Sequence, residues 1–261
     1  MPELPEVERY RVLAESALHR DVTGVVATDA WYLKRGLDEE TITSLVVGRR
    51  FVDARRTGKL LLLDVDGDGL VVGLRFGMSG RLIVDGRAGV DDLLYTSNRE
   101  DERWDRFVVR FADGGDLRMR DPRRLGGVEL SPNEALLGPD ARTITRSQLA
   151  RALRGARTAL KARLMDQAHV AGVGNLIADE ALWRAGLDPH REAGGLDDNE
   201  TRRLHRHLTK TIADLIERGG SHLGDVLPFR QAGARCPRDG AEMVRSVVGG
   251  RTTWWCPEHQ R

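Results

Sequence analysis

The sequence predicts an α+β multidomain protein, in which an N-terminal helix and an antiparallel β-sandwich precede a helical region and a C-terminal β-hairpin. Three observations predict this order. Residues 5–18 repeat apolar side chains at spacings of three and four, as an amphipathic helix does. From about 22 to 130, short apolar or alternating runs are separated by Gly/Asp turns, which is typical of an antiparallel sandwich. After about 146, leucines recur at helical spacing.

The first helix would hold the start of the chain against the rest of the protein, with Val7, Tyr10 and Ala14 on its apolar face. The strands that follow are short, because turns such as Asp66–Gly69 come between them. The predicted strands are Val22–Ala27, Phe51–Arg55, Leu60–Val65, Leu70–Arg75, Arg81–Val84, Phe107–Phe111 and Asp116–Arg120.

The helical region contains one break with a specific pattern. Gly172 and Gly174 interrupt a helix, and Asn175 stands where the next one begins, a position that asparagine favours. Free N–H groups at such a start can hold a phosphate, although a plain helical hairpin turn explains the pattern as well. Another helix is predicted over 201–217. The predicted divisions of the chain are 1–130, a linker at 131–145, a helical domain at 146–228 and a terminal hairpin at 229–261.

The bulk composition bounds the class of protein. The 261 residues are 40% hydrophobic and 31% charged, which suits a packed core and a solvated surface. No apolar run approaches the ~20 residues of a membrane span, and the N-terminus does not have the pattern of a secretory signal. Only two cysteines are present, which fits a reducing, cytoplasmic compartment. The net charge is only +1, but basic residues cluster, so a local face can still be positive.

The first residues, Met1-Pro2-Glu3, carry unusual chemistry. If Met1 is removed, Pro2 presents a secondary amine with a pKa of about 8, a fraction of which is neutral near pH 7. Such an amine attacks carbonyl-like carbons and forms an iminium, and Glu3 beside it could carry protons. The alternative is structural, because Pro2 and Pro5 also suit the first turn of a helix.

The last 30 residues suggest a metal site. Cys236 and Cys256 each begin a Cys-Pro-x-ligand segment, with Asp239 and His259 as the second potential ligands. Two such knuckles at the ends of a β-hairpin form a zinc-site layout, although a carboxylate is uncommon in a structural zinc site. A zinc-free hairpin held by its tryptophan pair is the alternative.

Together these motifs resemble the formamidopyrimidine-DNA glycosylase / endonuclease VIII family of base-excision repair enzymes. The resemblance runs nearly from end to end. It rests on the start Pro2–Glu8, on Arg56-Thr57-Gly58-Lys59, Gly77-Met78-Ser79-Gly80, Asp121-Pro122-Arg123-Arg124 and Gly172-Val173-Gly174-Asn175, and on the hairpin with Arg251.

The resemblance implies a bifunctional DNA glycosylase and abasic-site lyase. It further implies a sandwich domain, a helix–two-turn–helix domain and a zinc hairpin, with damaged double-stranded DNA between the domains. Pro2 would attack C1′ of a flipped nucleotide, and β,δ-elimination through the Schiff base would cut the strand. Glu3 would shuttle protons, Lys59 would hold phosphate and assist elimination, and Glu6 would shape the pocket.

The resemblance also implies the DNA contacts. Asn175 and Arg251 would grip the phosphates beside the lesion, and Lys161 would add a backbone contact. Met78 and Arg123 would fill the gap left by the flipped base. Taken singly, several of these residues also have ordinary structural explanations, such as a solvated turn lysine or a core methionine.

The sequence departs from the family pattern at three places. Leu125 stands where many members place a phenylalanine wedge, and Asp239 and His259 replace cysteines. Residues 219–235 form a short loop where members that cap a flipped 8-oxoguanine have a longer one. We therefore expect weak 8-oxoguanine excision and a preference for ring-opened purines, oxidised pyrimidines or abasic sites.

One other function class remains open at this stage. A non-catalytic protein that binds damaged DNA or abasic sites could use the same scaffold. Pro2, Glu3 and Lys59 favour the enzyme, because a binding protein needs none of the three. We also expect one structural zinc ion, a monomer and no membrane partner.

Overall fold

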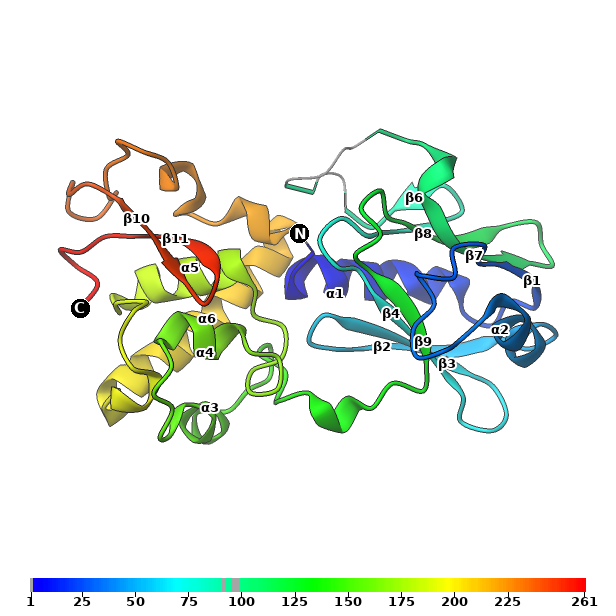
Figure 1. The fold of residues 1–261 in the computed structure, drawn as a ribbon, viewed down its shortest axis with the longest axis horizontal. Coiled ribbons are helices and arrows are strands. Elements are labelled where there is room, and N and C mark those ends of the chain that lie inside the picture. Colours follow the sequence, from blue (N-terminus) through cyan, green and yellow to red (C-terminus); the bar gives the residue numbers. More distant parts are fainter. Residues whose placement is uncertain (1, 91–92, 95–98) are drawn as a thin grey trace. The chain divides into compact units, whose positions relative to one another are not determined.

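The computed structural model describes residues 2–90, 93–94 and 99–261 (Figure 1). The chain forms two compact units, Met1–Glu134 and Ala135–Arg261. The predicted α+β architecture is confirmed, with one helix-and-sheet unit and one helical unit that ends in a strand pair. Within the described residues, no helix combines the length and apolar character that crossing a bilayer requires.

The first unit begins with α1 (Leu4–Ala14), which tightens into a 3-10 turn at Glu15–Ala17. A capping box starts the helix: Glu3 is the N-cap, and its backbone N–H donates to the Glu6 carboxylate at 2.9 Å. Proline in the first turn adds to this start signal. The predicted apolar face, including Val7 and Tyr10, is fully buried.

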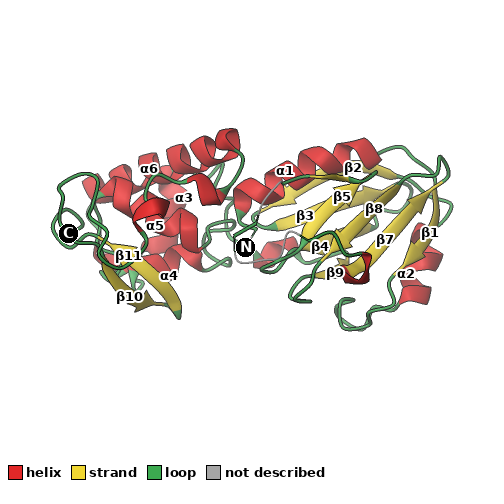
Figure 2. Ribbon diagram, turned by 90° about the horizontal axis from the view of Figure 1, so that it is seen from above, coloured by secondary structure: helices red, strands yellow, loops and turns green. Residues whose placement is uncertain are grey.

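Two antiparallel sheets make up most of the rest of this unit (Figure 2). Their facing side chains form one core together with α1. The five-stranded sheet has the order β1-β7-β8-β5-β6 and the four-stranded sheet the order β2-β3-β4-β9. The strands are β1 (Val22–Val26), β2 (Phe51–Thr57), β3 (Leu60–Val65), β4 (Val71–Arg75), β5 (Arg81–Val84), β6 (Arg87–Ala88), β7 (Asp105–Phe111), β8 (Asp116–Arg120) and β9 (Gly127–Leu130).

Four elements in the described part of this unit were not predicted. Helix α2 (Glu39–Val46) buries only Ile42 and Val46, so its apolar stripe is short. Strand β6 has two residues, and β9 begins within a Gly-Gly pair that reads as a turn. A 3-10 turn at Glu102–Trp104 precedes β7.

The second unit contains α3 (Arg146–Leu153), α4 (Leu160–Met165), α5 (Asn175–Ala185) and α6 (Asp198–Arg218). Helix α5 begins at Asn175, as predicted, and α6 extends the predicted helix by a few residues at its start. Capping boxes from Thr145 and Asp197 begin α3 and α6. Short 3-10 turns occur at Glu134–Leu136, Ala193–Gly195, Ser221–Leu223 and Leu227–Phe229.

The chain ends in the predicted hairpin of β10 (Val244–Val248) and β11 (Arg251–Trp255). Gly249 and Gly250 form its turn at φ values of 56° and 71°, a left-handed conformation in which glycine is strongly favoured. Helix α5 packs on α6 and also on β11, so it lies between them (Figure 2).

Candidate functional site

The N-terminal residues are held inside the first unit. Pro2 is buried, Glu3 is fully buried and Glu6 is 1% exposed. Both carboxyl groups therefore lie at the start of α1, where the positive end of the helix dipole favours negative charge. Pro2, Glu3 and Glu6 therefore lie together at the start of α1.

A buried ion pair fixes α1 to the turn that carries Lys59. The Arg56 guanidinium donates to Glu8 at 2.8 Å and to the Gly58 carbonyl at 2.8 Å. Burial alone would raise the pKa of Glu8, but hydrogen bonds from Arg56 and Arg11 hold that pKa below its usual value. The Arg56 guanidinium thereby connects the β2–β3 turn to the helix that begins beside Pro2. Lys59 is half-buried in this turn.

A second contact ties α1 to the loop that contains Met78. The Tyr10 hydroxyl donates to the Gly80 carbonyl at 3.2 Å, and its ring lies 4.5 Å from that of Phe76. Burial, reinforced by the charge of Glu6, raises the pKa of Tyr10 far above its ordinary value, so the hydroxyl stays protonated as a donor. Helix α1 is therefore fixed to both sheets.

The buried carboxylate of Asp121 organises the loop that contains Arg123 and Leu125. It accepts hydrogen bonds from the Ser79 hydroxyl, from the Arg123 backbone N–H at 3.1 Å and from the Gly126 N–H at 2.8 Å. The hydroxyl comes from the Met78 loop, so one carboxylate joins both loops. Arg123 is exposed and Leu125 is 49% exposed, so their side chains are free to meet a partner.

Gly77 brings the same two loops into close contact. Its φ is 55°, and a Cβ there would collide with the Leu125 backbone. Only glycine satisfies both conditions. Met78, Arg123 and Leu125 therefore belong to one surface region of the first unit, although they are more than 40 residues apart in the sequence.

In the second unit, Asn175 stands at the first position of α5, after the extended Gly174. The Gln167 side chain fixes the turn, since it accepts from the Gly172 N–H at 3.0 Å and donates to the Val173 carbonyl at 3.0 Å. Within the described residues, the buried Oδ1 of Asn175 has no hydrogen-bond partner. This turn thus presents the N–H groups of a helix start, which suit an anion, beside an amide oxygen that can only accept a hydrogen bond.

Lys161 is a correction to the sequence prediction. It is fully buried, and its ammonium lies 2.7 Å from the Asp179 carboxylate and donates to the Thr253 hydroxyl at 2.8 Å and the Thr252 carbonyl at 3.2 Å. Arg230 also pairs with Asp179, at 2.9 Å. Burial raises the pKa of Asp179 against these two opposing charges. Lys161 therefore holds β11 to α4 and α5, and its ammonium is buried rather than exposed.

Arg251 is exposed at the tip of the hairpin. The tip lies on α4, because a Cβ at Gly249 would approach Ala162 Cβ to 2.9 Å. Lys161, which comes from the same helix, fixes the next residues of β11. The guanidinium of Arg251 is thus carried on a hairpin whose backbone is held by contacts with α4.

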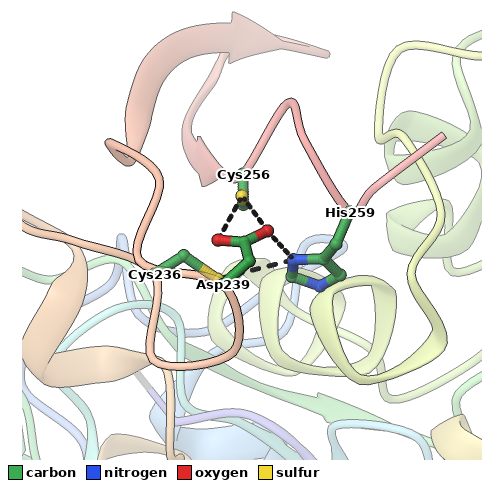
Figure 3. Close-up of side chains that lie close together, drawn as sticks. All are labelled: Cys236, Asp239, Cys256 and His259. Carbon is green, nitrogen blue, oxygen red and sulfur yellow. Dashed lines mark hydrogen bonds and ion pairs between the residues drawn. The ribbon is translucent and has the colours of Figure 1, made fainter.

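The four predicted metal ligands come together (Figure 3). Their donor atoms all lie within 4.8 Å of one another. Cys236 Sγ is 3.4 Å from His259 Nδ1, and Cys256 Sγ is 3.2 Å from Asp239 Oδ2. Ligands at zinc–donor distances of 2.0–2.3 Å on a tetrahedron are separated by about 3.5 Å, so this geometry fits one zinc ion.

Neighbouring residues orient these ligands. His259 Nε2 lies 3.0 Å from the Trp183 carbonyl, which leaves Nδ1 as the coordinating nitrogen. The Trp183 indole N–H donates to Cys236 Sγ at 3.4 Å, as thiolate ligands commonly require. Burial raises the pKa of the Cys256 thiol to about 11, and a bound divalent cation would reverse this shift. The donor set and its surroundings therefore fit a structural metal.

Sequence reasoning did not find the residues that hold the site in place, namely Glu8, Tyr10, Asp121 and Asp179. Asp121 offered a signal, since an acid before a proline and followed by glycines often organises a turn. The roles of Glu8 and Asp179 depend on partners far along the chain and leave no local signal.

Comparisons with known proteins agree with this fold. Residues 1–128 match the family model of the formamidopyrimidine-DNA glycosylase N-terminal domain, and 137–226 match that of its H2TH domain. A formamidopyrimidine-DNA glycosylase of Alkalilimnicola ehrlichii is 36% identical and one of Brevibacillus brevis 33%; the alignments cover 100% of this chain and 100% and 99% of those proteins. The chain belongs to the formamidopyrimidine-DNA glycosylase family.

A solved relative shares the whole fold. The structure described as a complex between the Lactococcus lactis Fpg and an abasic site containing DNA superimposes with a TM-score of 0.83 at 26% identity. The match covers 100% of both chains. Another structure of the Lactococcus lactis protein, in complex with an oxidized pyrimidine containing DNA, gives the same TM-score and identity.

Proposed function

We propose that the chain, as a DNA glycosylase of base excision repair with abasic-site lyase activity, performs both reactions through Pro2. After loss of Met1, the Pro2 nitrogen attacks C1′ of a flipped nucleotide, and the bond from C1′ to the base breaks. The sugar ring opens to an iminium on the proline nitrogen. Loss of a C2′ proton then expels the 3′ phosphate, and a second elimination expels the 5′ phosphate. Water finally releases the sugar remnant from Pro2.

The observation that carries this proposal is the buried Pro2-Glu3 pair at the head of a helix fixed to both sheets. A nucleophile at a chain terminus needs such support, because a frayed end would not keep the attacking nitrogen aligned with C1′. Glu3 is adjacent and moves protons to the ring oxygen and the leaving groups. Glu6, bonded to the Glu3 backbone N–H, sets the orientation of that residue.

Lys59 supplies the positive charge for the elimination steps. Its turn is tied to α1 by Arg56, so a phosphate held by Lys59 stays in register with the iminium. Asn175 and Arg251 bind the phosphates that flank the lesion, and neither reads the base sequence. Met78, Arg123 and Leu125 fill the space of the flipped nucleotide from two joined loops.

We propose that Cys236, Asp239, Cys256 and His259 hold one structural zinc ion. The ion would cross-link the two knuckles and so fix the base of the hairpin that carries Arg251. The fit of four donor atoms within 4.8 Å supports this assignment. Metal analysis of the purified protein should find one zinc ion per chain.

The lesion preference follows from the short loop and from Leu125. Residues 219–235 form two 3-10 turns and offer little chain to cover a flipped purine. We therefore propose that ring-opened purines, oxidised pyrimidines and abasic sites are preferred. Release of each base from defined duplexes tests this preference, and strong excision of 8-oxoguanine opposite cytosine would contradict it. Damaged duplex DNA is the proposed partner, bound by a monomer.

Borohydride trapping tests the chemistry. The wild type is incubated with a duplex that contains one abasic site, after mass spectrometry has established that Met1 is absent. A covalent adduct that maps to Pro2 is expected, and Pro2→Gly, whose primary amine forms an imine in place of the iminium, should lower its yield. Glu3→Gln should bind the duplex but excise damaged bases poorly. Tight binding without any adduct from the wild type would instead indicate a non-catalytic damage-binding protein.

A further inference from the structure

A second cationic surface lies in the helical unit, away from the residues assigned above. In a hollow of about 390 Å³ near the C-terminal half of α6, two acids pair with Arg184 and Arg218. A second hollow of about 350 Å³, between α3 and the start of α6, has only one acid. The second hollow is lined by Arg146, Arg151, Arg154 and Arg202, with Asp198 as its one acid. Four guanidinium groups against one carboxylate give it a net charge of about +3.

The side chains of Arg146, Arg151 and Arg154 make no hydrogen bond or ion pair within the described residues. Other arginines of this chain are well neutralised: Arg20 and Arg55 each bind two carboxylates. Like charges gathered without counter-charges repel each other, so this cluster costs stability in the free protein. An anion from outside the chain would remove that cost, and planar guanidinium groups suit phosphate oxygens.

The positive surface continues along α6. Arg202, Arg206 and Lys210 are exposed at intervals of four residues and so lie on one helix face. Eight residues of helix rise roughly 12 Å, over which one DNA strand presents three to four phosphates at 3.4 Å each. Burial, and after it the charges of Arg206 and neighbouring arginines, lowers the pKa of His207, which agrees with a positive local field. The extended shape favours a polyanion over a single small anion.

This surface is distinct from the one that carries Arg251. Helix α5 lies between α6 and β11, so the arginines of α3 and α6 lie beyond α5 from the hairpin (Figure 2). We propose that α3 and α6 form a second contact for the phosphate backbone of duplex DNA, separate from the contacts that grip the lesion. The contact is sequence-independent and adds affinity for damaged and undamaged duplex alike.

The test compares two double variants of equal charge change. Arg151→Gln/Arg154→Gln removes two guanidinium groups from the hollow, whereas Arg87→Gln/Arg110→Gln removes two exposed arginines of the other unit. The dissociation constant for an undamaged duplex is measured between 50 and 200 mM salt. Two lost phosphate contacts should lower the slope of log K against log salt by about 1.8, which is up to about 60-fold in affinity at 0.1 M salt.

The control variant should keep the wild-type slope. A slope unchanged in Arg151→Gln/Arg154→Gln, or lowered equally in the control, would overturn the proposal. Tight binding of inorganic phosphate with an unchanged DNA slope would identify a small-anion site instead. Loss of borohydride trapping at saturating protein would place these arginines at the lesion, which also contradicts a separate contact. Thermal melting verifies that each variant is folded.

Discussion

Substitution of the buried Lys161 by methionine gives the sharpest test of how the hairpin is held. The change removes the charge opposite Asp179 and two hydrogen bonds to Thr252 and Thr253, while methionine keeps most of the volume. Breaking a buried pair costs about 3–5 kcal/mol. The lower value, about 3 kcal/mol, is expected, because Arg230 still pairs with Asp179 at 2.9 Å.

Urea unfolding followed by tryptophan fluorescence measures this loss, since Trp183, Trp254 and Trp255 lie in the same unit as Lys161. With a slope of about 1–3 kcal/mol per molar urea, the midpoint should fall by roughly 1–3 M. Lys210→Met is the matched control, because Lys210 is exposed and its loss should change stability by less than about 0.5 kcal/mol.

The opposite pattern would refute the reasoning. If Lys161 contacted a phosphate, Lys161→Met would leave the urea midpoint unchanged and lower the salt slope of DNA binding by about 0.9. The ion pair with Asp179 would then contribute nothing to the unit's stability. Measurement of both quantities on the same preparation separates the two explanations.

Three further predictions concern the proposed metal ligand Asp239, the proposed wedge residue Leu125 and the pH dependence of the stabilisation by Glu8. Asp239→Ala should lower zinc content and thermal midpoint together, as metal analysis and calorimetry would measure, and full zinc retention would contradict the assigned ligand set. Leu125→Phe should tighten binding to an abasic-site duplex several-fold, because aromatic stacking on a base is worth about 1–3 kcal/mol, and unchanged affinity would remove Leu125 from the DNA surface. Glu8 has a folded pKa below its unfolded value, so its stabilisation is present above about pH 4.5 and is lost as pH falls through the folded pKa. Urea midpoints of wild type and Glu8→Gln should therefore differ at pH 7 and converge in acid, and a constant difference would exclude ionisation as the cause.

The sequence predicted the elements whose pattern is local. Strand β3, an apolar run between a Gly turn and an Asp/Gly turn, was predicted with its observed bounds, and the C-terminal hairpin was predicted without bounds for its strands. The metal knuckles were predicted for the same reason, because each pairs a cysteine with a ligand three residues later. Such patterns depend only on neighbours in the chain.

The errors concern properties set by the tertiary structure. Lys161 was expected to contact the DNA backbone, as the family resemblance implied, and its burial depends on Asp179 and Thr253, which lie farther along the chain. Strand β9 was missed because its Gly127 start reads as a turn, although pairing with β4 decides its conformation. Burial and pairing of this kind cannot be read from one sequence.

The hairpin with Arg251 is held at its metal end, near its middle and at its tip. The proposed metal ligands Cys256 and His259 follow β11 and would hold its end when a metal is bound, while Lys161 holds Thr253 near the middle of the strand. The tip rests on α4, because Gly249 lies against Ala162. A structural change at the metal end of the hairpin is therefore separated from Arg251 by the contact between Lys161 and Thr253. Metal loss should consequently lower the stability of the second unit before it displaces Arg251. The stability of the protein and its affinity for DNA would then respond separately to metal loss.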